Sequence, residues 1–321
     1  MLSRVADHLY WMSRYLERAE HAARLIDVQL YRRLDQSPAF GGSRWERLAA
    51  CLRVSLPDED LRDDYKTIQA LTFDDSNPGS LISCLASARE NARNIRSEVS
   101  SEMYEELNQL YLSIRQARQQ SDWLTAPHDI FQLVKDGAYL FQGITDTTMN
   151  HGEGWHFIHL GRYLERASSL ARLLDVHFST FSTGPNETIT SDDYLEWVGL
   201  LNSCTAFEAY RKVYTADATP RNVAEFLLLN PEFPHSVCFS IEKLQQSLDG
   251  IAVATEMKRV GGVFRVVGRL RAALGFDQVD EIIREPGLHE YLIDVQKQCV
   301  QIHDSLYRTF INYSAEAALA A

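Results

Sequence analysis

The sequence predicts an all-α protein, an internally duplicated helical bundle with two pseudo-symmetric copies. The hexapeptide RYLERA at 14–19 recurs at 162–167, and the residues around it match as well. A repeat of this kind indicates one structural unit present twice. Apolar residues recur at helical spacing, and no run alternates apolar and polar side chains with period two. We therefore expect a first helical repeat at 1–150 and a second at 151–321, packed as one compact domain.

The composition limits the class of protein. The chain has 321 residues, of which 45% are hydrophobic, so it can bury a sizeable core. A net charge of -12 and a pI near 5.3 argue against nucleic-acid binding and against adhesion to an anionic membrane. No apolar run reaches the roughly 18 residues of a membrane span, and the N-terminus does not read as a signal peptide. Five cysteines without a Cys-x-x-Cys motif do not form a disulfide framework. We expect a cytoplasmic protein.

The first copy is predicted to open with a helix over 3–35. Met12, Leu16, Ala19 and Ile26 fall on one side of this helix, and Pro38 follows its end. Further helices are predicted over 45–54, 58–71, 81–99, 101–118 and 128–146, separated by Pro, Gly and acidic capping residues.

The second copy is predicted to begin after a break at 150–154. Its helices are expected over 155–181, 192–214, 220–230, 235–255, 259–274 and 289–312. Cys51 aligns with Cys204 and Cys84 with Cys238, all within apolar stretches. We interpret these cysteines as small core residues.

A charged stripe recurs on the first helix of each copy. Its members are Arg14, Glu17, Arg18 and Arg24 in the first copy, and Arg162, Glu165, Arg166 and Arg172 in the second. The neighbouring Glu20 and His21 are replaced by Ser168 and Ser169. The charged residues are the same in both stripes although these neighbours differ, which indicates that the charges have specific partners. We favour an interhelical arginine–carboxylate network that holds the two copies in register over an anion-binding site.

A second charged cluster occurs in one copy only. It consists of Arg89, Glu90, Asn91, Arg93 and Arg96, and its counterpart, aligned through the cysteines, lacks the arginines. Duplicated packing should recur in both copies, whereas a ligand site need not. The arginines are spaced to bind a carboxylate or phosphate. A salt-bridged surface helix explains the cluster equally well.

No metal or cofactor site is predicted. Glu153 and His156 have the Glu-x-x-His spacing of di-iron bundles, but Val5 stands at the matching glutamate position of the first copy. The acidic run at 58–60 follows Pro57 and is interpreted as helix capping. The sequence contains neither a phosphate-binding glycine-rich loop nor a Gly-x-Ser-x-Gly motif.

Several of these segments together resemble the bacterial alpha-E family. They are residues 8–20, the Asn77-Pro78 turn, and the stretches 88–93, 161–167 and 287–290. Ser13 stands where the family often has a glycine, as at Gly161, and we expect this departure to be minor. The resemblance covers essentially the whole chain. It implies an all-helical protein of a family that lacks an established activity.

The resemblance also implies a functional setting. Alpha-E proteins tend to be encoded beside, or fused to, a circularly permuted ATP-grasp protein, often with a transglutaminase-like protease, and ATP-grasp enzymes make amide bonds through acyl phosphates. This context implies an accessory or substrate-binding protein of a peptide or amide ligation system. Arg89, Arg93 and Arg96 would engage an anionic group of the partner or peptide, with Glu90 and Asn91 orienting it. The repeated charged stripes would hold the bundle together and line a central cleft.

The alternative is an enzyme that uses helix-borne glutamates as general acid and base on a peptide or amide. The candidates are Glu17, Glu165 and Glu90. This hypothesis predicts an accessible pocket with one of these carboxyl groups at its base and a raised carboxyl pKa.

Overall fold

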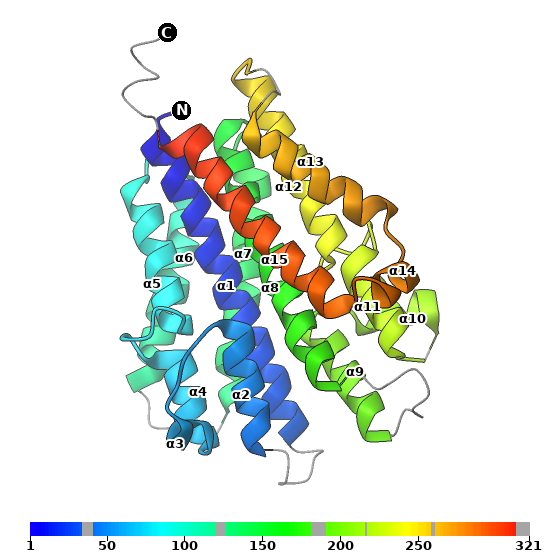
Figure 1. The fold of residues 1–321 in the computed structure, drawn as a ribbon. Helices are drawn as coiled ribbons and strands as arrows, with labels where there is room; N and C mark the ends of the chain where they lie inside the picture. Colours follow the sequence, from blue (N-terminus) through cyan, green and yellow to red (C-terminus); the bar gives the residue numbers. More distant parts are fainter. Residues whose placement is uncertain are drawn as a thin grey trace.

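The all-α prediction is confirmed. The computed structural model describes residues 1–33, 41–119, 123, 126–181, 191–215, 217–257 and 261–312, and within these ranges every regular element is a helix (Figure 1). One continuous apolar core runs through the described residues.

The two longest helices form the centre of the fold. They are α1 (Ser3–Arg33) and α8 (Glu153–Phe181), the helices that carry the repeated hexapeptide. They run side by side in the same direction, as their contacts show: residues later in α1 contact residues later in α8. Gly154 lies against Leu9, and Glu165 lies against Arg14. Both helices are buried on most of their sides, because other helices surround them: every residue at 19–27 of α1 and at 157–162 of α8 is buried. The sequence periodicity predicted a single apolar face, which is narrower than the buried surface.

The helices around this pair are arranged alike on its two sides. α5 (Leu81–Asn94) and α7 (Pro127–Thr148) pack on α1, and α6 (Ser101–Gln119) packs on both. α12 (Val237–Ala254) and α15 (Leu288–Leu306) pack on α8, and α13 (Gly262–Phe276) packs on both. In Figure 1, α5 and α6 lie on one side of the central pair and α12 and α13 on the other.

Short helices complete the two sides. They are α2 (Gly41–Leu52), α3 (Asp58–Leu61), α4 (Asp64–Phe73), α9 (Ser191–Ser203), α10 (Phe207–Tyr214), α11 (Pro220–Leu229), α14 (Val279–Arg284) and a π-helical turn, η3 (Tyr307–Ile311). α2 packs on both α1 and α8, so its C-terminal end lies close to the central pair.

Three predicted helices were wrong in extent. The helix expected over 58–71 is two helices, because the Asp63 side chain accepts the Tyr65 and Lys66 N–H groups and caps a new one. The helix expected over 192–214 is interrupted at Thr205, which has a φ of 50°. The helix expected over 81–99 ends at Asn94. α14 was not predicted, and the helix ends predicted at 35 and 259 lie outside the described residues.

The central helices approach closely at Gly161. A Cβ atom there would lie 2.2 Å from the Tyr10 carbonyl oxygen and 2.2 Å from Ser13 Oγ. The Ser13 hydroxyl also donates a hydrogen bond to the Ile158 carbonyl, at 2.7 Å. Ser13 therefore uses the space that Gly161 leaves and bonds the two helices together.

Substitution of Gly161 by alanine should destabilise the protein by about 3 kcal/mol, because the added methyl group meets α1 backbone that cannot move aside. Gly143→Ala on α7 is the matched control, since nothing lies within 4 Å of its Cβ position. The control should be neutral or up to about 1 kcal/mol more stable. Urea unfolding of both variants measures the difference. Equal stability of the two variants would contradict the close approach.

Candidate functional site

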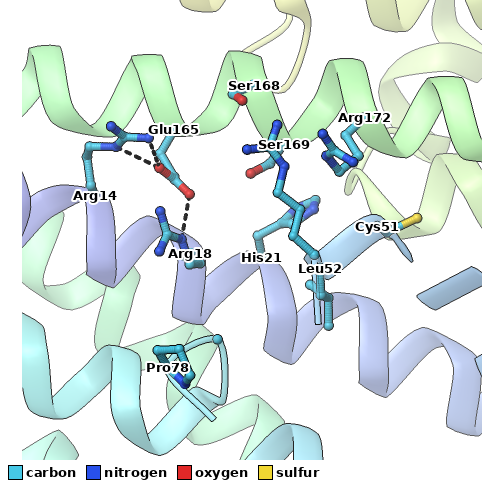
Figure 2. Close-up of a pocket in the computed structure, with 12 residues that line it drawn as sticks. Arg14, Arg18, His21, Cys51, Leu52, Pro78, Glu165, Ser168, Ser169 and Arg172 are labelled. Atoms are coloured by element: carbon cyan, nitrogen blue, oxygen red, sulfur yellow. Dashed lines mark hydrogen bonds and ion pairs between the residues drawn. The ribbon is translucent and has the colours of Figure 1, made fainter. Parts of the chain in front are cut away.

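Arginines of each central helix bind the glutamate of the other. Arg14 donates from Nε and Nη2 to Glu165 Oε2 at 2.7 and 2.6 Å, and Arg18 Nε donates to Oε1 at 2.7 Å (Figure 2). In the opposite direction, Arg166 donates from Nε and Nη2 to the two oxygens of Glu17 at 2.5 and 2.9 Å. These side chains are buried apart from Arg14 and Arg18, which are partly exposed.

The environment keeps both carboxylates ionised. Burial by itself would raise the pKa of Glu165, but Arg14 and Arg18 lower it to about 2. Burial opposes ionisation of Glu17 in the same way, and Arg166 nevertheless lowers its pKa. A general acid near neutral pH needs a raised carboxyl pKa. The raised pKa that the enzyme hypothesis predicts is therefore wrong for Glu17 and Glu165.

The other arginines of the stripes have different surroundings. Arg24 is buried, forms a close ion pair with Glu20, and lies 3.1 Å from His235 Nδ1 through its Nη1. Arg162 is buried, and its guanidinium lies 5.8 Å from the centre of the Tyr163 ring. Arg172 faces a pocket and is treated below.

A pocket of about 260 Å³ opens beside Glu165, between α1, α8, the end of α2 and the loop before α5. It is lined by Arg14, Arg18, His21, Cys51, Leu52, Arg53, Pro78, Gly79, Glu165, Ser168, Ser169 and Arg172. Figure 2 shows the α1 side chains on one side of this space and the α8 side chains on the other. Sequence analysis placed Arg14, Arg18, Glu165 and Arg172 in one network, and the structure brings all four to this pocket.

Two of the lining arginines have no carboxylate partner among the described residues. Arg53 follows the last residue of α2 and adopts a left-handed backbone conformation, with φ 57°. The Nε atom of Arg172 is buried without a hydrogen-bond partner. Burial lowers the pKa of Arg172, and the nearby charge of Arg53 lowers it further. Burial also lowers the pKa of His21 to about 4, so this ring is neutral at pH 7. The pocket therefore carries an excess of positive charge.

The predicted Arg89 cluster does not gather around a pocket. Arg89 Nε donates to Asn108 Oδ1 at 2.7 Å, and Arg93 pairs with Glu90 within α5 at 2.7 Å. The other two residues are held elsewhere: the Arg96 guanidinium lies 4.3 Å from the centre of the Tyr104 ring, and Asn91 lies 2.8 Å from His8 Nδ1. Asn91 is therefore not placed to orient a group bound by the arginines.

Several residues that line the pocket were not predicted to belong to a site. They are Arg53, His21, Ser168, Ser169 and Cys51. Arg53 follows a helix and belongs to no periodic stripe, so no pattern singled it out. The replacement of Glu20 by Ser168, with the arginine four residues later retained as Arg172, was a usable signal. It marks a guanidinium whose local carboxylate has been removed.

Other features of the described residues offer weaker sites. A hollow of about 560 Å³ lies near the beginnings of α1 and α8, but its charged lining is Glu98 and Glu153. Glu153, half of the Glu-x-x-His pair, already binds the Met1 amino group at 2.8 Å. In the part of the chain that the structure describes, no cluster of three or more His, Cys, Asp or Glu side chains could hold a metal ion. Within the same ranges, no helix has the length and apolarity to span a bilayer.

These features define an all-α protein built on two parallel helices that exchange arginine–glutamate pairs. The chain belongs to the Alpha-E family, described as a predicted alpha-helical domain with a conserved ER motif, whose model matches residues 1–311. The resemblance found in the sequence is thereby confirmed. Two Glu-Arg dipeptides of this chain, Glu17-Arg18 and Glu165-Arg166, lie within the exchange between α1 and α8.

The chain is also similar to longer mycobacterial proteins. It is 25% identical over 267 residues to the uncharacterized protein Mb2597 of Mycobacterium bovis and to the uncharacterized protein Rv2567 of Mycobacterium tuberculosis. Each match covers 76% of this chain, and the chain spans 29% of the length of these relatives. No solved structure matches the chain significantly.

Replacement of Glu165 by glutamine should destabilise the protein by about 3–5 kcal/mol at pH 7, because two desolvated guanidinium groups lose their counter-ion. Since the folded-state pKa of Glu165 is lowered from 4.5 to about 2, its stabilising effect is complete above pH 4.5. The effect is lost as the pH falls towards 2. The stability gap between wild type and variant should therefore narrow over this range.

Urea unfolding at pH 7, 4.5 and 3 measures the gap. Glu208→Gln removes an exposed carboxylate on α10 and is the matched control, with an expected change within about 0.5 kcal/mol. A gap for Glu165→Gln that stays constant down to pH 3 would show that ionisation of Glu165 does not stabilise the fold.

Proposed function

We propose that this protein is a helical accessory or substrate-binding component of an ATP-grasp-linked peptide or amide ligation system. We further propose that its arginine-lined pocket holds an anionic group of the ligand. The observation that carries the proposal is the charge of this pocket, where four arginines surround one glutamate and two of them have no carboxylate partner among the described residues.

The donors that remain unused support anion binding. Arg14 donates from Nε and Nη2 to Glu165 and from Nη1 to the Tyr10 hydroxyl, at 3.0 Å. Arg18 uses Nε on the same carboxylate. The forks of Arg53 and Arg172 are uncommitted within the described residues, and a guanidinium fork matches a carboxylate or phosphate with two parallel hydrogen bonds. A partly enclosed pocket screens such pairs less than open solvent does.

The link to amide ligation rests on the family. ATP-grasp enzymes activate carboxylates as acyl phosphates, so their substrates and intermediates are anions that a cationic pocket fits. The chain spans 29% of its mycobacterial relatives, which places the Alpha-E region beside other sequence in those proteins. In this proposal the partners are an ATP-grasp ligase and a transglutaminase-like protease, and the protein acts in the cytoplasm.

We also propose that residues 1–150 and 151–321 are duplicated copies. Matching contacts on the two sides support this. Asp27 pairs with His128 at 2.5 Å and with Lys135 at 2.7 Å. Asp175, its counterpart, lies 2.6 Å from His289 and 3.3 Å from Gln296. The buried Trp45 and Trp197 occupy matching places in α2 and α9.

Anion binding should depend on the unpaired arginines. Calorimetric titration with succinate should show binding to the wild-type protein, and Arg53→Ala and Arg172→Ala should each weaken it at least tenfold, about 1.4 kcal/mol. Arg115→Ala removes an exposed arginine of α6 outside the pocket and should bind as the wild type does. Equal weakening in all three variants would point to the general field of the protein instead of the pocket.

Arg89, which is partly buried, and Arg93, which is exposed, supply a separate prediction about the partner of α5. A pull-down of the tagged protein from its native host should recover an ATP-grasp ligase, and Arg89→Ala combined with Arg93→Ala should reduce the recovery while helicity remains intact. The double variant Arg115→Ala with Arg118→Ala on α6 is the control. Undiminished recovery by the Arg89/Arg93 variant would remove α5 as the contact surface.

A further inference from the structure

Arg24 and Arg172 occupy matching positions on the two central helices but differ in their counter-ions. Arg24 is 2% exposed and pairs with Glu20, which lies four residues earlier on the same helix. Arg172 has Ser168 at that position, so it lacks this carboxylate. The Nε atoms of both arginines are buried without a hydrogen-bond partner among the described residues. The second helix has kept the guanidinium and lost the carboxylate that neutralises it on the first.

The surroundings of the two arginines match in other respects. Burial raises the pKa of Cys204 and of Cys51 to about 12, and the largest opposing charge is Arg24 for Cys204 and Arg172 for Cys51. Each arginine thus lies beside the C-terminal part of a short helix, α9 or α2. The two arginines therefore share one neighbouring element and differ in counter-ion and in burial, since Arg24 is buried and Arg172 only partly so.

The residues that follow α2 and α9 make the charges around Arg172 and Arg24 differ further. Both helices end in a left-handed residue, Arg53 with φ 57° and Thr205 with φ 50°. In each case the next N–H group bonds back into the helix, from Val54 to the Ala49 carbonyl at 3.0 Å and from Ala206 to the Leu201 carbonyl at 2.8 Å. The same turn therefore presents an uncharged threonine on one side and a second guanidinium on the other.

The two places consequently have different charge balances. Beside Arg24 the acids are present within the chain: Glu20 pairs with Arg24, and Glu17 pairs with Arg166. In the pocket, Glu165 pairs with Arg14 and Arg18, and no described carboxylate forms an ion pair with Arg53 or Arg172. The charge of Asp175 favours the ionised form of Arg172, but Asp175 itself pairs with His289. Arg53 is exposed and Arg172 is partly buried, so their like charges repel each other across the mouth of the pocket, and an anion between them would relieve that repulsion.

We propose that the pocket binds a carboxylate-bearing ligand whose carboxylate takes the place of the missing counterpart of Glu20, between Arg172 and Arg53. The Ser168 and Ser169 hydroxyls line the same space and can donate to the bound group. The matching arginine is neutralised by a carboxylate, which favours a carboxylate over a phosphate here. A volume of about 260 Å³ leaves room for further atoms of a small acidic molecule or an acidic side chain. This inference rests on the proposed anion-binding function and specifies its ligand class.

The substitution Ser168→Glu tests the inference by supplying the missing carboxylate from the chain itself. The glutamate should pair with Arg172 as Glu20 pairs with Arg24, so the variant should bind succinate at least tenfold more weakly than the wild type. Its urea midpoint should be equal to or above that of the wild type. Ser168→Gln has nearly the same size without the charge and should bind succinate at least threefold more tightly than Ser168→Glu. Titrations use buffers free of carboxylate and phosphate, with inorganic phosphate as the second probe.

The outcomes separate this inference from the function on which it rests. If the wild type binds neither succinate nor phosphate, the anion-binding pocket fails, and this inference fails with it. If the wild type binds succinate and Ser168→Glu binds it equally well, only the placement of the carboxylate is overturned. If Ser168→Glu and Ser168→Gln lose the same amount of succinate affinity, the idea that the glutamate charge replaces the ligand carboxylate is overturned. If the wild type binds phosphate but not succinate, the assignment of a carboxylate ligand is overturned. If Ser168→Glu does not fold, Arg172→Ala decides, since unchanged succinate binding there overturns the placement.

Discussion

The exchange of arginine–glutamate pairs between α1 and α8 is the constraint on which the rest of the structure depends. A buried ion pair adds little net stability compared with apolar packing, but breaking one is costly because a desolvated charge is left alone. A shift of α8 by one helical turn, about 5.4 Å, would separate Glu165 from Arg14 and Arg18 and separate Arg166 from Glu17. The pairs therefore select one register of the central helices, and the surrounding helices pack on the surface that this register creates.

The same pair of helices provides both close packing and open space. At Gly161 the absence of a side chain lets the helices approach until the Ser13 hydroxyl bonds to the opposite backbone. Farther along, Ser168 and Ser169 stand where α1 carries Glu20 and His21, and their small size contributes to the pocket. The small side chains of Ser168 and Ser169 thus leave space on α8 where the corresponding residues of α1 are large and charged or aromatic.

Much of the fold followed from the sequence, because the signals that define it are periodic or repeated. The repeated hexapeptide indicated the two central helices, and the recurrence of the charged stripe indicated arginine–carboxylate pairing between them. Helix interruptions were not predicted where a single residue causes them. The Asp63 side chain caps the start of α4, and the left-handed backbone of Thr205 prevents α9 from continuing. Such local effects are not visible in hydrophobic periodicity.

The site was harder to predict than the fold. The cluster at Arg89, Arg93 and Arg96 was predicted because the aligned stretch in the second half of the sequence lacks it, but each side chain contacts a different neighbour. Only tertiary structure shows that Arg53, from a distant turn, stands beside Arg172. Helical spacing shows which residues share one face, whereas a binding site depends on which faces and turns meet.

The unpaired arginines also connect stability with ligand binding. The charges of Arg53 and Arg172 repel each other, and partial burial of Arg172 adds a desolvation penalty, so these two cations are an unfavourable part of the fold. Beside Arg24, a glutamate of the chain itself supplies a carboxylate in a close ion pair. A ligand that supplies the carboxylate to the folded state alone stabilises that state by mass action. The pairs at Glu17 and Glu165 keep the central helices in register whether or not the pocket is occupied, so the fold can retain an open cationic site without losing its alignment.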